Sequence, residues 1–479
     1  MNRKLIFKLV GVILLIEAVC LLAPLLYACV TGGDDREAFL YSMLICAFTG
    51  GFLARIRTAD LRLQTRDGFV CVALCWIALS LFGALPYFFI GCGYVDAVFE
   101  TVSGLTTTGA SIFESPEALP RGILLWRSLT QWMGGMGVLV MVLALLPKLS
   151  EGGVNLMKAE SPGPIKTKLR PKTSETARVL YRIYIALTAA ETALLRVAGL
   201  PWFDAVATSL ATISTGGFSV RDRSILFYHS EAVSWIVLVF MFLSAVNFSL
   251  LFLAVRGRLK DALKSEELRA YAGITAGAAA IITLDLVVRG GHPLYTSFSK
   301  AAFQAVSVMT TTGFFTADFD LWPHFSRSVL LVLMFVGGCS GSTAGGVKVS
   351  RVLVLFKSLK RELQRILHSR EVRPICLDGQ RVEETTVSAV TIFFFAYTAI
   401  LLLAAAVISL DDISFVSAFS AAMSTLSNVG PGLAQLGPTR NFGFLSALSK
   451  LTLSWTMLLG RLEIMPLLVL LMPSVWRRK

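Results

Sequence analysis

The sequence has 479 residues, of which 55% are hydrophobic and 16% are charged. The mean hydropathy of +0.70 is too high for a soluble protein of this length and indicates a polytopic membrane protein. The net charge of +13 does not indicate a nucleic-acid-binding protein, because the basic residues collect in alternate short loops, as in the cytoplasmic loops of membrane proteins.

Two apolar segments begin the chain and are predicted to cross the membrane. They cover about Leu5–Ala28 and Ala38–Leu53, and about 20 apolar residues span a bilayer. The first segment lacks an obvious signal-peptide cleavage site, so we interpret it as a retained helix. The loop that follows is rich in arginine and is predicted to be cytoplasmic. We assign 1–66 to this N-terminal helix pair.

The rest of the chain reads as four copies of one unit, with boundaries at 67–150, 151–260, 261–375 and 376–479. In each unit a long apolar segment is followed by a shorter helical segment, a polar turn and a second long apolar segment. The first long segments are Phe69–Ile90, Val179–Leu200, Tyr271–Val288 and Thr391–Leu410; the short ones are Tyr94–Leu105, Trp202–Thr212, Pro293–Met309 and Phe415–Leu426; the second long ones are Ile123–Leu146, Ala232–Val255, an interrupted segment from Val329, and Leu451–Met472. The predicted fold is therefore an all-α membrane protein with four pseudo-fourfold helix–pore loop–helix repeats around one pore. With the N-terminal pair it has about ten spans, and both termini are predicted to be cytoplasmic.

The four polar turns are the candidate ion filter. Irregular polar backbone is tolerated at membrane depth only where it is buried in protein or lines a water-filled cavity. Glycine lets carbonyl groups turn towards a common axis, and a ring of carbonyls from four loops can replace the hydration shell of potassium. The alternative is that each turn merely caps a helix. Aligned on one glycine per turn, the predicted ion-binding residues are Thr107, Thr108, Gly109, Ser214, Thr215, Gly216, Thr311, Thr312, Gly313, Asn428, Val429 and Gly430.

The fourth turn differs from the other three, because Asn428 and Val429 stand where the others have threonine or serine. The ring is then only pseudo-fourfold. We expect it to discriminate less sharply among monovalent cations than a channel built from identical subunits.

A glycine-rich run interrupts the last segment of the third unit. Ten small residues in mid-membrane hold a helix poorly, because glycine costs about 1 kcal/mol per helical position. The run follows the third turn by one segment and is predicted to lie below the filter, as a flexible gate or, alternatively, as a packing or kink device. Lys348, at its cytoplasmic end, is interpreted more as an interface residue than as a gate charge. With the arginine considered next, the gate residues are Gly337, Gly338, Ser340, Gly341, Ser342, Thr343, Gly345, Gly346, Lys348 and Arg461.

Arg461 is a charge within the last apolar segment. An arginine at the centre of a membrane helix costs about 2.5–3.5 kcal/mol on insertion scales, so it is expected to face the interior and a partner. Candidate partners are Glu463, the carbonyls of the glycine-rich run, or water. Its positive charge beneath the filter would repel cations and hold the path shut; the alternative is a structural ion pair.

These features resemble the Trk/Ktr superfamily of potassium-uptake proteins. The resemblance rests on the four pore-loop repeats, the run Gly337–Lys348 and the closing Gly460–Ile464, and it covers nearly the whole chain. The N-terminal helix pair is similar to the Trk-type membrane subunit. The resemblance implies potassium as the transported ion and a multi-pass protein of the bacterial inner membrane. It also implies a homodimer with one pore per subunit, and a peripheral cytoplasmic nucleotide-binding subunit that controls the gate.

Other functions remain open on the sequence. A related protein that prefers sodium, or couples uptake to sodium or protons, has the same architecture. An enzyme is not indicated, because no nucleophile–base set, metal cluster or phosphate-binding motif is found. A gated scaffold whose basic loops only dock a partner is a further alternative. We expect no covalently bound cofactor and no nucleic-acid partner. We expect the protein to be surrounded by membrane lipid.

Overall fold

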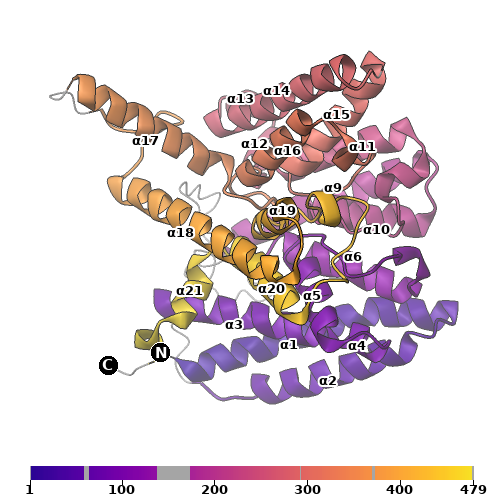
Figure 1. Cartoon of the computed structure of the whole chain (residues 1–479). Helices are drawn as coiled ribbons and strands as arrows, with labels where there is room; N and C mark the ends of the chain where they lie inside the picture. The colour runs from indigo at the N-terminus through magenta and orange to yellow at the C-terminus, as the bar shows by residue number, and fades with distance from the viewer. Residues whose placement is uncertain (1, 59–63, 138–172, 292, 369–372, 477–479) are drawn as a thin grey trace.

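The computed structural model describes residues 2–58, 64–137, 173–291, 293–368 and 373–476. This part of the chain is almost entirely helical (Figure 1), and its β structure is one small antiparallel hairpin in which Cys376 pairs with Arg381. The strands are β1 (Cys376–Leu377) and β2 (Gln380–Arg381). The predicted all-α membrane fold is confirmed.

The N-terminal helix pair forms as predicted, from α1 (Arg3–Thr31) and α2 (Arg36–Ala54). The two helices approach each other at Gly11 and Gly50, where a Cβ on either glycine would collide with the backbone of the other helix. Small residues allow such close helix contacts in membranes. The pair packs against the first repeat, α1 lying beside α3 and α6.

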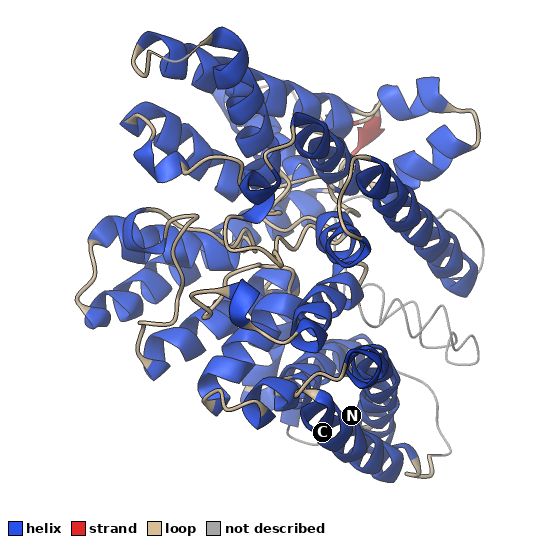
Figure 2. Ribbon diagram, turned by 90° about the vertical axis from the view of Figure 1, so that its right-hand side faces the viewer, coloured by secondary structure: helices blue, strands red, loops and turns tan. Residues whose placement is uncertain are grey.

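Each of the four repeats begins with a long outer helix and continues into a short pore helix. The outer helices are α3 (Thr65–Gly83, continued by α4, Leu85–Phe89), α9 (Thr173–Val197), α14 (Glu266–Val288) and α18 (Glu384–Ile408). The pore helices are α5 (Tyr94–Leu105), α10 (Trp202–Ile213), α15 (Leu294–Met309) and α19 (Phe415–Leu426). The predicted short segments agree with these helices to within one residue at each end. Figure 2 shows several loops that pass through the middle of the molecule between the helices, while other loops lie at its edge.

Each repeat returns through a further helix after its pore loop. These return helices are α6 (Arg121–Gly135), α11 (Glu231–Ser244), α16 (His324–Val336) and α20 (Ala447–Arg461). After the break the chain continues as α12 (Phe248–Val255), α17 (Val349–Leu367) and α21 (Met465–Leu471) in repeats two to four. The continuation of the first return segment, up to Leu146, lies outside the described residues.

The uninterrupted spans predicted for repeats two and four were wrong. The axes of α11 and α12 differ by 105°, and the Asn247 side chain caps the new helix by accepting a hydrogen bond from Ser249 N at 2.8 Å. In repeat four the break includes Glu463 and Ile464, both with positive φ (55° and 67°). Of the breaks in repeats two to four, only the glycine-rich break of repeat three was predicted.

Five described helices are long and apolar enough to cross a membrane, or six if the bent pair counts as one. The predicted total of ten spans stays a prediction, because the broken return helices are too short for that criterion. The remaining elements are α13 (Leu259–Leu263), α22 (Pro473–Trp476) and the 3-10 turns η1 (Pro116–Ala118), η3 (Ser224–Tyr228), η4 (Phe319–Leu321), η5 (Ser409–Asp411) and η6 (Ala434–Leu436).

Candidate functional site

The loops after the four pore helices share one backbone conformation. We call them loop 1 (106–110), loop 2 (214–218), loop 3 (310–314) and loop 4 (427–431). The second residue of each loop is left-handed: φ is 56° at Thr107, 55° at Thr215, 57° at Thr311 and 58° at Asn428. The fourth residue of each is a glycine with positive φ: 82° at Gly109, 77° at Gly217, 86° at Gly313 and 102° at Gly430.

The structure corrects the predicted alignment of loop 2 by one residue. Thr215 N bonds to Thr212 O as Thr107 N bonds to Gly104 O, so Thr215 corresponds to Thr107. Gly217, which the sequence prediction missed, is therefore the counterpart of Gly109. Two adjacent glycines made the register ambiguous, because sequence alone does not tell which of them takes positive φ.

The four corresponding glycines close the loops into a ring. A Cβ on Gly109 would come closer than van der Waals contact to the carbonyl oxygen of Gly216 in loop 2. The same relationship joins Gly217 to Thr312 O, Gly313 to Val429 O and Gly430 to Thr108 O. Each loop thus places its glycine against a carbonyl of the next loop, in the order 1, 2, 3, 4 and back to 1. A side chain at any of the four glycines would push apart two neighbouring loops.

We call the four carbonyls that face these glycines the ring carbonyls: Thr108 O, Gly216 O, Thr312 O and Val429 O. The residue before each ring carbonyl has positive φ. Threonine rarely adopts positive φ, and such a residue costs on the order of 1–3 kcal/mol unless its surroundings hold it in place. Thr311 is held by the hydrogen bond that its Oγ1 accepts from Gly345 N at 2.7 Å. Asparagine tolerates this conformation better. The Asn428 amide donates to Thr108 Oγ1 at 3.0 Å and to Met457 O at 2.9 Å, so it ties loop 4 to loop 1 and to α20.

The glycine-rich loop, 337–346, lies against the segments where loops 2, 3 and 4 begin. Gly345 N donates a hydrogen bond to Thr311 Oγ1 of loop 3. A Cβ on Gly345 would collide with Ser427 O of loop 4. Thr343 Oγ1 donates to Ile213 O, just before loop 2, at 3.2 Å. The run therefore lies against the candidate filter, and its position below the filter stays a prediction.

Both ends of the glycine-rich loop are fixed by hydrogen bonds. Glu267 on α14 accepts from Ser340 N at 2.6 Å and from Ser350 N at 3.2 Å. Lys348 N donates to Val336 O at 2.9 Å, which closes the neck of the loop. Gly341 at its tip is exposed. The backbone of the run is thus less free than its glycine content suggested.

Arg461 links the glycine-rich loop to the first repeat. Its guanidinium donates to Thr343 O at 2.7 Å and to the carbonyl oxygens of Gly134 and Gly135 at the end of α6. Of the three predicted partners, the carbonyls of the glycine-rich loop are confirmed.

Glu463 instead pairs with Lys348 and Arg351. Lys348 Nζ lies 3.0 Å from a Glu463 carboxylate oxygen, and Arg351 contacts the other oxygen. Lys348 is only 8% exposed, so its interpretation as an interface residue was wrong. It belongs to a buried charge cluster that joins the end of the glycine-rich loop to the break of repeat four.

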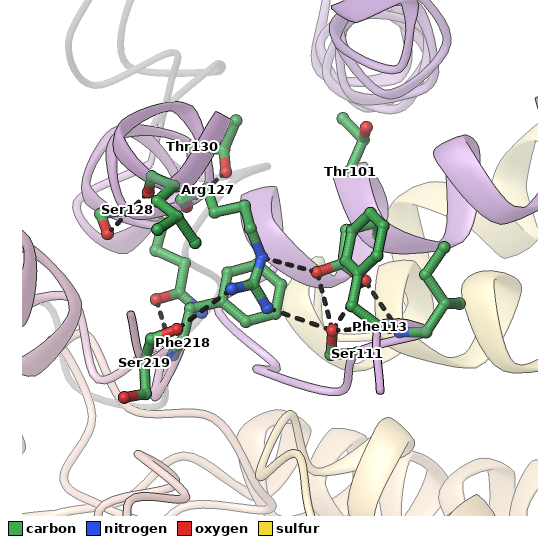
Figure 3. Close-up of polar contacts among 12 residues, drawn as sticks. Thr101, Ser111, Phe113, Arg127, Ser128, Thr130, Phe218 and Ser219 are labelled. Atoms are coloured by element: carbon green, nitrogen blue, oxygen red, sulfur yellow. Dashed lines mark hydrogen bonds and ion pairs between the residues drawn. The ribbon is translucent and has the colours of Figure 1, made fainter. Parts of the chain in front are cut away.

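A buried ion pair beside loops 1 and 2 was missed by the sequence prediction. Arg127 Nε on α6 lies 2.8 Å from Glu100 Oε1 on α5, and both side chains are almost fully buried. The Glu100 carboxylate also accepts from Ser111 Oγ and from Ile112 N, just after loop 1. Figure 3 shows the Arg127 guanidinium between Ser111 and the backbone of Ser219, just after loop 2.

This network connects the outer ends of two neighbouring loops. The Arg127 guanidinium lies 4.1 Å from the centroid of the Phe218 ring, a cation–π contact. The sequence did contain a signal for this pair, namely two opposite charges in apolar segments. Charged residues within membrane segments face the protein interior and pair with a partner. The separation of Glu100 and Arg127 by 27 residues hid the pairing.

Similarity to known proteins shows which family this chain belongs to. The family model described as "Cation transport protein" (TrkH) matches residues 35–269 and 285–477. The Trk system potassium uptake protein TrkH of Halomonas elongata is 38% identical over 484 residues, and TrkH of Escherichia coli K12 is 38% identical over 487; both matches cover 100% of each chain. The crystal structure of the potassium transporter TrkH from Vibrio parahaemolyticus matches with a TM-score of 0.89 and 37% identity, over 100% of both chains.

The apolar helices, the ring of loops and these similarities define a multi-pass membrane protein that transports cations and is not an enzyme. The chain belongs to the TrkH family of cation transport proteins.

Proposed function

We propose that this protein takes up potassium through a gated pore whose selectivity filter is the ring of loops 1 to 4. The observation that carries the proposal is the cyclic contact of four positive-φ glycines with four carbonyls, Thr108 O, Gly216 O, Thr312 O and Val429 O. Relatives of full-length similarity are named potassium uptake proteins, which supports potassium as the ion.

The chemistry of the ring suits a dehydrated monovalent cation. Carbonyl oxygens from four loops can replace the water around potassium. The repeated glycine keeps side chains out of the contacts between loops, and the buried hydroxyls of the loops (Thr106, Thr107, Thr108) keep the surroundings polar. Among the proposed ion-binding residues, the structural alignment adds Gly217 and gives Ser214 the position of Thr106.

The glycine-rich loop is proposed as the gate. This proposal is supported by the contacts of the glycine-rich loop with loops 3 and 4 and with Ile213, just before loop 2. The ends of the glycine-rich loop are fixed and its tip is exposed. Arg461 places a positive charge at the same level and binds the Thr343 carbonyl. We infer that the closed state includes this bond, and that opening requires residues 341–345 to leave their contacts while the neck stays paired.

We further propose a homodimer in the bacterial inner membrane, with both termini in the cytoplasm and a cytoplasmic nucleotide-binding subunit that regulates the gate. The naming of the relatives as parts of a Trk system and the basic loops support this. The start of α1 and helix α21 lie on the same side of the molecule (Figure 1), which agrees with termini on one face of the membrane.

Complementation tests the proposal. Cells that lack their own potassium uptake receive this protein, with and without a co-expressed regulatory subunit, and growth at low potassium and rubidium uptake are measured. Rescue with rubidium uptake is the expected result. Sodium uptake that exceeds rubidium uptake, with the protein in the membrane, would contradict a potassium-selective pore.

A further inference from the structure

Loop 2 lacks a side chain that the other three loops have. The third residue of the loops is Thr108, Thr312 and Val429 in loops 1, 3 and 4, but Gly216 in loop 2. Its φ is not in the left-handed range, so the backbone does not require glycine there.

In loops 1 and 3 this third residue is fixed by a partner within its own loop. Thr108 Oγ1 lies 2.8 Å from Thr106 Oγ1, and Thr312 Oγ1 lies 2.8 Å from Thr310 Oγ1. In loop 2 the first residue is Ser214, whose hydroxyl bonds to carbonyls of α10 instead. Loop 2 therefore lacks the hydroxyl pair that stiffens loops 1 and 3.

The side chain of Gln131, from α6 of the neighbouring repeat, fills the vacant position. A Cβ on Gly216 would collide with the Cγ, Cδ and Oε1 atoms of Gln131. Gln131 is fully buried. Its Nε2 donates to Gly216 O at 2.6 Å, and its Oε1 accepts from Phe218 N at 3.1 Å. One amide thus holds the backbone on both sides of Gly217, the ring glycine of loop 2.

Gly216 O is the ring carbonyl that faces Gly109. Within the described residues, it is the only one of the four ring carbonyls that accepts a hydrogen bond from a side chain. Arg127, one helical turn before Gln131 on α6, holds the backbone just after loop 2 by donating to Ser219 O at 3.1 Å. Helix α6 of repeat one therefore braces the filter loop of repeat two.

We propose that Gln131 is a positioning residue of the selectivity filter, which replaces the missing hydroxyl pair of loop 2 and sets the direction of the Gly216 carbonyl. The inference rests on the proposed function. It adds that discrimination between potassium and sodium depends on an amide outside the four loops, and that Gly216 and Gln131 form one unit in which either residue requires the other.

The test measures rubidium uptake and its inhibition by sodium for Gln131→Met, which keeps the length of the side chain and removes both hydrogen bonds. We expect this variant to retain uptake and to lose up to about thirtyfold in rubidium-over-sodium discrimination, because two hydrogen bonds of ordinary strength together correspond to about that factor. Gln131→Ala gives the same shift. Gln435→Ala, at an exposed glutamine, is the matched control and leaves discrimination unchanged.

The decisive variant is the double substitution Gln131→Ala with Gly216→Thr, which gives loop 2 a threonine that can bond to the Ser214 hydroxyl. We expect it to recover most of the discrimination that Gln131→Ala loses, and Gly216→Thr alone to displace the Gln131 amide and lose discrimination. Normal discrimination in Gln131→Met, or no recovery in the double variant, would overturn the inference. Absence of rubidium uptake by the unaltered protein would instead count against the proposed function.

Discussion

Arg461 and Thr343 are 118 residues apart in the chain, yet the Arg461 guanidinium donates a 2.7 Å hydrogen bond to the Thr343 carbonyl. The same guanidinium also binds the end of α6 through Gly134 and Gly135. One side chain of repeat four therefore fastens the glycine-rich loop of repeat three to the return helix of repeat one. It does so through three backbone carbonyl groups.

Replacing Arg461 with alanine is expected to raise the resting flux. The substitution removes both the charge at the level of the glycine-rich loop and the bond that holds Thr343. Purified protein in liposomes, assayed for rubidium flux without any soluble partner, measures the effect. Arg461→Lys keeps the charge but lacks the planar guanidinium. Its flux is expected to lie between that of the unaltered protein and that of Arg461→Ala. Correctly folded Arg461→Ala protein with unchanged flux would contradict the gating role, and loss of folded protein would favour a structural one.

Deleting Ser340–Ala344 is expected to increase flux. The deletion removes the residues that contact α11 and the end of α10, while the pairing of Lys348 with Val336 keeps the neck closed. Rubidium flux in liposomes measures the effect, and Gln435→Ala, at an exposed glutamine outside the loop, is the control. Equal or lower flux in a well-folded deletion variant would refute the gate.

Removing one partner of the Glu100–Arg127 pair is expected to destabilise the protein by about 3–5 kcal/mol, because the other charge remains buried without its partner. Thermal unfolding in detergent of Glu100→Gln and of Arg127→Met measures the loss. The double variant leaves no buried charge, so we expect it to be more stable than either single variant. Additive losses would show that the two side chains do not act as a pair.

Much of the fold follows from local signals in the sequence. The short pore helices were predicted almost to the residue, because a glycine, proline or serine precedes each one and a polar turn ends it. Loops 1, 3 and 4 were aligned correctly because each has a single glycine. Loop 2 was not, because Gly216 and Gly217 are adjacent and only tertiary contacts separate their roles: Gln131 fills the space beside one, and the other faces Thr312 O.

The breaks in repeats two and four could not be predicted, because long-range contacts stabilise them. The bend after α11 is held by Phe248 N bonding to Gly341 O and by Cys339 N bonding to Ala245 O. Glu463 keeps its positive φ next to Lys348 and Arg351. The break of repeat two contains neither glycine nor proline, so the apolar pattern continues through it. The break of repeat four contains Glu463 and is flanked by Gly460 and Pro466, but the apolar residues resume directly after it.

The central claim is that the positive-φ glycines close four loops into the ion path, and Gly217→Ala tests it most directly. An added Cβ there meets Thr312 O, whereas Gly257 has a similar φ (78° against 77°) with nothing within 4 Å. Gly257→Ala therefore imposes the same backbone strain away from the ring.

The measurement is rubidium uptake, with sodium competition, at matched amounts of membrane-inserted protein. We predict that Gly217→Ala loses uptake or selectivity and that Gly257→Ala keeps both. Equal behaviour of the two variants would contradict a filter built from these loops.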